Sequence, residues 1–177
     1  MFKKLWLILL ILAAVFLSGC ATSASQNAMS MSIGDMPAKL NPDLKGNVNI
    51  RNVSGGQETN PLWISKVDNL GFKSALEQSM TAIGYMAPRG SPAKYQIDAT
   101  LQNLDQPAFG LTFNVKSTVT YIISGESGQK IFPVTAIGSA STSDAFIGME
   151  RMRIANERSI KENIKLFITN ISEQFKR

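Results

Sequence analysis

Histidine is absent from the sequence, and cysteine occurs once, at Cys20. Without histidine, the chain lacks the commonest general base, the commonest zinc ligand and every serine–histidine or cysteine–histidine nucleophile pair. A single cysteine excludes an intramolecular disulfide, so a domain in an oxidising compartment must be stabilised by hydrophobic burial. Charged residues make up only 18% of the chain, with a net charge of +5. Because no basic cluster with interleaved aromatic residues is visible, we predict no nucleic-acid partner.

The first residues have the architecture of a signal peptide. Lys3 and Lys4 are followed by an unbroken apolar run, Leu5–Leu17. A helix over this run would be about 20 Å long, which is short of the ~30 Å hydrocarbon core of a bilayer. A permanent transmembrane span is therefore disfavoured.

The four residues Leu17, Ser18, Gly19 and Cys20 resemble the lipobox of bacterial lipoproteins. Small residues at positions 18 and 19 let the peptide bond before Cys20 enter a protease, and the Cys20 thiol is the nucleophile that receives diacylglycerol. We predict lipidation at Cys20 and removal of residues 1–19 as a signal peptide. The alternative is an ordinary signal peptide or membrane-buried helix with an incidental cysteine.

Attachment to a membrane follows from this resemblance, which implies three acyl chains on Cys20. At ~0.8 kcal/mol per buried CH₂, two or more chains make release negligible. Ala21 stands where an enterobacterial inner-membrane retention signal would have aspartate. We expect the periplasmic face of the outer membrane in a Gram-negative source, and the cytoplasmic membrane in a Gram-positive one.

The segment after Cys20 is small and polar with scattered methionines, and it has neither helical nor alternating periodicity. We predict a lipidated cysteine and flexible tether over residues 20–43, followed by a single α+β periplasmic domain over residues 44–177. Fully extended, residues 21–36 would reach roughly 50 Å at ~3.3 Å per residue. The alternative is that the methionines pack on the domain.

Hydrophobic periodicity predicts four strands and two helices in that domain. The strands are Gly46–Val53, Tyr95–Gln102, Leu111–Ile123 and Phe132–Ala140, the last two joined by a turn at Gly125–Gly128. One helix is expected over Asn69–Ile83 with Gly84 as its carboxyl-terminal cap. The other is expected from Asp144 or Met149 to Phe175, with Ser143 and Asp144 as starting caps.

The order β-α-β-β-β-α predicts an α+β fold with one mostly antiparallel four-stranded sheet and both helices packed on one face. The other sheet face would be in water. On the last strand the residues of one face become smaller from Phe132 to Gly138, which favours a close approach of a helix.

One segment carries a further resemblance. Leu76–Met86, followed by a turn with proline and glycine and by the strand at Tyr95, is similar to the central segment of the YajG family of small Gram-negative lipoproteins. The lipobox, the hairpin and a last helix with Asn156, Ile160 and Ile164 inward fall in the same order. More remotely, the layout resembles auxiliary lipoproteins of outer-membrane assembly and lipid transport. The resemblance implies location and fold, and no catalytic residue.

Catalysis is disfavoured. The 13 carboxylates show no metal-loop spacing. Ser124–Gly128 lacks the spacing of a nucleophile elbow and lies where a hairpin turn is required. We therefore expect no cofactor, no metal and no enzyme, although a histidine-free acid/base pair of carboxylates could still assemble in three dimensions.

Two features could bind a partner. In the loop Asp105–Gly110 and just beyond it, Phe109 and Leu111 could be exposed beside an unpaired strand edge, or Phe109 could cover the open end of the core. On the last helix, Arg151, Arg158 and Lys165 recur every seven residues and could face anionic lipid or polymer. Interleaved glutamates, with Glu157 to Lys161 as a favourable pair, make a solvated helix face the better interpretation.

The sequence therefore predicts a non-enzymatic envelope lipoprotein that binds a protein partner or an envelope polymer at the membrane surface. The alternative is an auxiliary subunit that handles lipid or lipopolysaccharide directly.

Replacing Cys20 tests the anchor. A Cys20→Ala variant is expected to lose incorporation of labelled palmitate and to retain the leader, because the acyl acceptor is gone. A variant that is still cleaved and still membrane-bound would show that the anchor is assigned wrongly.

Overall fold

The computed structural model describes residues 21–60 and 64–175. The main elements are β1 (Val48–Ser54), α3 (Asn69–Ala82), β2 (Tyr95–Asp105), β3 (Phe113–Gly125), β4 (Gly128–Ala140) and α4 (Gly148–Gln174). The predicted order β-α-β-β-β-α is confirmed. A short helix, α2 (Gln26–Met29), and two 3-10 turns, Ile33–Asp35 and Pro42–Leu44, precede β1.

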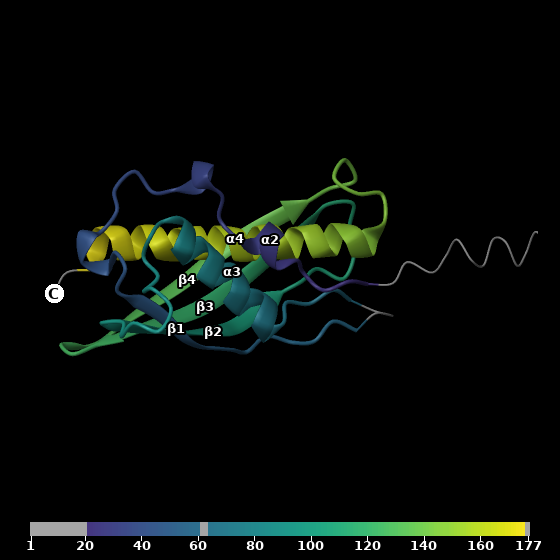
Figure 1. The fold of residues 1–177 in the computed structure, drawn as a ribbon. Helices are drawn as coiled ribbons and strands as arrows, with labels where there is room; N and C mark the ends of the chain where they lie inside the picture. The colour runs from purple at the N-terminus through teal and green to yellow at the C-terminus, as the bar shows by residue number, and fades with distance from the viewer. Residues whose placement is uncertain (1–20, 61–63, 176–177) are drawn as a thin grey trace, which may run out of the picture.

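The four strands form one sheet in the order β1-β2-β3-β4. β1 pairs with β2 in parallel, while β2–β3 and β3–β4 are antiparallel. A parallel pair requires a crossover, which α3 supplies. Both α3 and α4 lie on the same face of the sheet (Figure 1). The predicted α+β class and the placement of both helices on one face are confirmed.

Helix α3 has a cap at each end. The Asp68 carboxylate accepts a hydrogen bond from the Gly71 N–H (2.7 Å), and the predicted cap Gly84 has a φ of +75° after the helix ends. Near the start of the helix, Leu70 is exposed and Phe72 is buried. Two residues along a helix turn by about 200°, so these two side chains point in opposite directions.

Helix α4 begins at Gly148, and its N-cap is Ile147, which makes no side-chain cap. The prediction that Ser143 and Asp144 cap the helix is therefore wrong. The Asp144 carboxylate instead accepts hydrogen bonds from the Ser141 N–H (2.8 Å) and from Arg158 (2.7 Å). Asp144 therefore stabilises the turn before the helix and does not cap the helix.

The contact between α4 and β4 is unusually close, as the small residues of β4 predict. A Cβ atom built on Gly138 would lie 2.1 Å from the Ser159 nitrogen and 2.4 Å from the Ala155 oxygen. Ser117 on β3 lies in the same contact, where its N–H donates to the Ser159 hydroxyl (3.0 Å). The backbones of helix and sheet therefore touch without intervening side chains.

Buried polar groups in this layer are paired with one another. The Asn163 amide donates to the Val134 and Ser117 carbonyls (3.1 and 3.3 Å) and accepts from the Tyr121 hydroxyl (2.9 Å). Tyr121 also stacks on Phe167, with ring centroids 3.8 Å apart. Burial raises the pKa of the Tyr121 hydroxyl. These bonds stabilise one register of α4 over the sheet, because a shifted helix would leave buried polar atoms unpaired.

Gly138 provides a direct test of this contact. Gly138→Ala is expected to lower the free energy of unfolding by about 3 kcal/mol or more, because the added methyl group would collide with backbone atoms of α4. Backbone atoms in the middle of a helix cannot move aside as the end of a flexible side chain can. Urea denaturation would measure the loss. Gly34→Ala is the matched control, since nothing lies within 4 Å of a Cβ there. Equal stability of the two variants would contradict the close approach.

Candidate functional site

Residues 21–44, here called the strap, pack against the domain. Ala21, Ala24, Met29, Met31 and Leu44 are all buried, and α2 contacts both α3 and α4. The flexible tether predicted over residues 20–43 is therefore wrong for its described part, and the alternative of packed methionines is what the structure shows. Met29 and Met31 belong to the main hydrophobic core, which only the folded domain provides.

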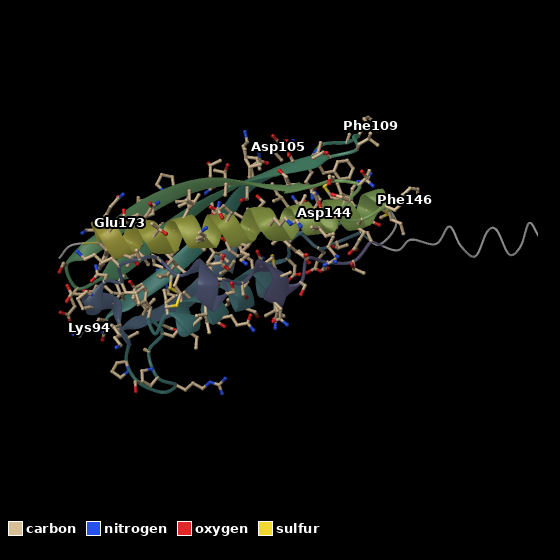
Figure 2. The ribbon with its side chains drawn as sticks, turned by 90° about the horizontal axis from the view of Figure 1, so that it is seen from above. Lys94, Asp105, Phe109, Asp144, Phe146 and Glu173 are labelled. Carbon is tan, nitrogen blue, oxygen red and sulfur yellow. The ribbon has the colours of Figure 1, made fainter. Side chains whose placement is uncertain are left out.

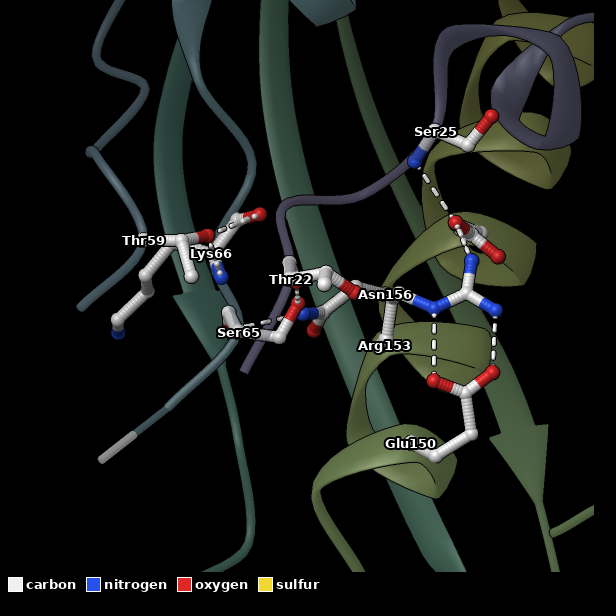
Figure 3. Close-up of polar contacts among 9 residues, drawn as sticks. Thr22, Ser25, Thr59, Ser65, Lys66, Glu150, Arg153 and Asn156 are labelled. Carbon is white, nitrogen blue, oxygen red and sulfur yellow. Dashed lines mark hydrogen bonds and ion pairs between the residues drawn. The ribbon is translucent and has the colours of Figure 1, made fainter. Parts of the chain in front are cut away.

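Polar contacts hold the beginning of the strap (Figure 3). The Ser25 N–H donates to the Glu157 carboxylate (2.7 Å), and the Thr22 carbonyl accepts from the Ser65 hydroxyl (2.7 Å). The Ala24 N–H donates to the Lys66 carbonyl (3.2 Å). The strap is thus bonded both to α4 and to the segment that leads into α3.

Glu157 is a buried carboxylate whose charge is balanced by Arg153. Arg153 also pairs with Glu150. The two glutamates raise the pKa of the Arg153 guanidinium, and the hydrogen bond to Glu150 is the main cause. The predicted pair between Glu157 and Lys161 is wrong: Glu157 binds Arg153, and Lys161 forms an ion pair with Asp35 in the strap (2.7 Å). The hydrogen bond from Lys161 lowers the pKa of Asp35.

Further along, the strap follows α4 to its end. The Met31 N–H donates to the Ser79 hydroxyl of α3 (2.9 Å). The Asn41 N–H donates to the Tyr85 hydroxyl (2.7 Å), and the Asn41 amide donates to the Phe175 carbonyl (2.6 Å). The segment that the sequence predicted to be a tether therefore runs along the domain and not away from it.

Two loops at one end of the molecule carry an exposed apolar group, here called the apolar tip. It consists of Phe109, Leu111, Phe146 and Ile147, with exposures of 90%, 76%, 92% and 56%. Figure 2 shows Phe109 and Phe146 at the same end. The alternative that Phe109 covers the core is wrong, because Phe113, Val115 and Met152 already fill that end of the core.

Arg151 joins the two loops of the tip. Its guanidinium donates to the Ala145 and Phe146 carbonyls (3.0 and 2.7 Å) and to the Gly110 carbonyl (3.4 Å). It also lies over the Phe113 ring at 5.2 Å. The predicted solvated cationic face is therefore wrong at Arg151, whose exposure is only 7%.

The other two members of the predicted cationic face are paired at the surface. Arg158 forms an ion pair with Asp144 (2.7 Å), and its hydrogen bond lowers the pKa of that carboxyl to about 2. Lys165 lies 3.7 Å from Glu162, with both side chains substantially exposed. A solvated face describes this part of the helix correctly.

Hydrogen bonds connect the start of the strap, through Ser65, to the loop that carries Phe109. The Ser65 carbonyl accepts from Gln106 (2.8 Å) and from Asn156 (3.0 Å), while the Ser65 hydroxyl binds the Thr22 carbonyl. Gln106 lies three residues before Phe109 in the same loop. The described chain begins at the end of the molecule where Figure 2 labels Phe109 and Phe146.

Leu17, Ser18, Gly19 and Cys20 lie outside the described residues. Within residues 21–60 and 64–175, no three acidic side chains come together as a metal site. In the same part of the chain, no helix is long and apolar enough to cross a membrane.

No family model matches the chain, and no curated protein matches it. Solved structures with a similar arrangement include a candidate lipoprotein of Caulobacter crescentus (TM-score 0.44, 10% identity, 71% of this chain and 87% of that chain). They also include a hypothetical protein of Chlamydia trachomatis (0.42, 11%, 72% and 93%) and a minor lipoprotein of Acinetobacter baumannii (0.39, 17%, 57% and 81%). With TM-scores below 0.5, these likenesses establish neither a family nor a function for this chain, and the resemblance to YajG stays a prediction.

The strap can be tested with two substitutions in the same segment. Met29→Ser is expected to lower the free energy of unfolding by about 2–4 kcal/mol, because a fully buried side chain is lost. The Ser25 amide should then exchange its hydrogen faster. Ile33→Ser, at a residue that is 81% exposed, should change neither quantity. If Met29→Ser costs no more than Ile33→Ser, the segment is the tether that the sequence predicts.

Proposed function

We propose that this chain is a lipid-anchored protein of the bacterial envelope, without enzymatic activity, that binds a protein partner or an envelope polymer at the membrane surface. The observation that carries the proposal is that the described fold begins at the residue directly after the predicted lipobox. Ala21, the residue after the predicted acyl acceptor, is already buried, and Thr22 is bonded to Ser65. A mature chain starting at Cys20 would thus be folded from its second residue.

The anchoring chemistry requires a donor lipid and water. The Cys20 sulfur forms a thioether with the diacylglyceryl carbon of a phosphoglyceride, and the thiol proton leaves with the phosphate-ester leaving group. One water molecule then hydrolyses the peptide bond between Gly19 and Cys20, which releases the leader and frees the Cys20 amine for a further acyl group. Ala21, in place of aspartate, favours the periplasmic face of the outer membrane in a Gram-negative source.

The non-enzymatic part of the proposal is supported by how the buried polar side chains are used. Tyr121, Asn163, Ser117 and Ser159 bond to one another and to backbone carbonyls, so they stabilise the packing of α4 and are not directed into a cavity. Arg51 and Asp98 pair with each other on the outer face of the sheet. These groups do not combine into an acid/base or nucleophilic pair facing a substrate pocket.

The lipid-handling alternative has less support. The depression lined by Tyr95, Ile123 and Phe175 has more apolar than polar surface, but its volume is only about 110 Å³. Pockets that enclose a drug-sized ligand have volumes of roughly 300 Å³ or more. An acyl chain would need a larger space than this depression offers. A depression of about 630 Å³ lies beside the loop at Met86–Ser91, but its lining includes Glu77, Arg89 and other polar side chains that do not suit an acyl chain.

The chemical state of Cys20 tests the anchor in the purified protein. Full-length protein expressed in a Gram-negative host and extracted from membranes is expected to begin at Cys20, to carry acyl groups by intact mass, and to resist labelling by a maleimide. The reason is that the sulfur of its only cysteine is held in a thioether and carries no free S–H group. Ser127→Cys, at an exposed turn, is the positive control for labelling. A Cys20 that reacts with maleimide in the native chain would overturn the proposal.

A further inference from the structure

Arg151 joins the two loops that carry the apolar tip. It binds carbonyl groups of both loops, so Phe109 and Leu111 on one loop are held beside Phe146 and Ile147 on the other. Four exposed apolar side chains gathered in this way differ from the scattered exposed residues normal on a soluble surface. A gathered apolar patch of this kind is typical of a contact with another apolar phase or molecule.

The loops of the tip carry almost no free charge. Residues 106–112 contain no charged side chain. Residues 141–147 contain only Asp144, and that carboxylate is paired with Arg158. Gln106, the first polar side chain behind Phe109, is bonded to Ser65 and Lys66. Little charged surface would therefore lose water if the tip entered an apolar environment.

The start of the chain decides what lies against the tip. Cys20 is one peptide unit from Ala21, about 3.8 Å between Cα atoms. The strap is bonded to Ser65 and Glu157 at the end of the molecule that carries the tip, so the chain enters the domain at that end. Acyl groups on Cys20 would therefore bring this end of the molecule to the lipid surface. A protein partner at the tip would have to displace that membrane.

We infer that the apolar tip, formed by Phe109, Leu111, Phe146 and Ile147, inserts into the headgroup region of the membrane that holds Cys20. Aromatic and aliphatic side chains of peripheral proteins enter this region in the same way. The inserted tip and the acyl groups together fix the orientation of the domain, with the turn between β3 and β4 pointing away from the lipid (Figure 1). The inference rests on the proposed anchor, and it assigns to lipid the loop that the sequence offered to a protein partner.

A fluorophore beside the tip tests the insertion in the lipidated full chain. Ala108 is exposed and next to Phe109, so Ala108→Cys labelled with an environment-sensitive dye leaves the tip intact. In vesicles of phosphatidylethanolamine and phosphatidylglycerol, the label is expected to shift to the blue and to be quenched by lipids with a nitroxide near the headgroup. The same dye on Ser127→Cys, at the opposite end, should show neither effect. An Ala108→Cys label that behaves like the Ser127→Cys label would overturn the inference.

A second comparison separates insertion from mere proximity. Phe109→Ser with Phe146→Ser, added to the labelled Ala108→Cys chain, is expected to abolish most of the quenching while the protein stays on the vesicles. Ile131→Ser, which removes an exposed apolar side chain from the sheet, should leave it unchanged. Unchanged quenching in the double variant would overturn insertion. Failure of the anchor itself appears separately, as a native chain that labels at Cys20 and does not remain on the vesicles.

Discussion

The close approach of α4 to β3 and β4 is the constraint on which the rest of the molecule depends. At Gly138 the sheet has no side chain at all toward the helix, and the Ser159 backbone lies where a Cβ would be. Apolar burial alone would let a long helix slide or rotate over a sheet. The bonds of Asn163 and Ser117 in the same layer select one position, because every other position leaves a buried amide or hydroxyl without a partner.

A fixed α4 positions both ends of the candidate site. Glu157 and Lys161 hold the strap on one side of the helix, and Arg151, two turns before Ser159, holds the loops of the apolar tip. Neither the strap nor the tip has a core of its own. Both depend on side chains that α4 presents in the right places, so the described start of the chain and the exposed apolar side chains come to lie at one end of the domain.

Local pattern was enough to predict the elements, and it failed where burial depends on distant partners. Strict alternation along β3 and the glycine after α3 are signals within one segment. Met29 has no periodic neighbours, and its burial requires a groove that exists only after α3 and α4 have packed. Arg151 has the sequence context of a surface cation, but its partners are loop carbonyls that folding brings to it. Phe109 is exposed because other residues already close the core, which its own loop does not reveal.

The described chain is folded from Ala21, the residue after the proposed anchor, so an anchored domain is expected to lie on the membrane without a spacer. Neutron reflectometry of the lipidated protein on a supported bilayer measures the distance between the protein layer and the headgroups directly. Protein density that begins within the headgroup layer, with no water between, is the result predicted here. A hydrated gap approaching roughly 50 Å, the reach of residues 21–36 when fully extended, would contradict it.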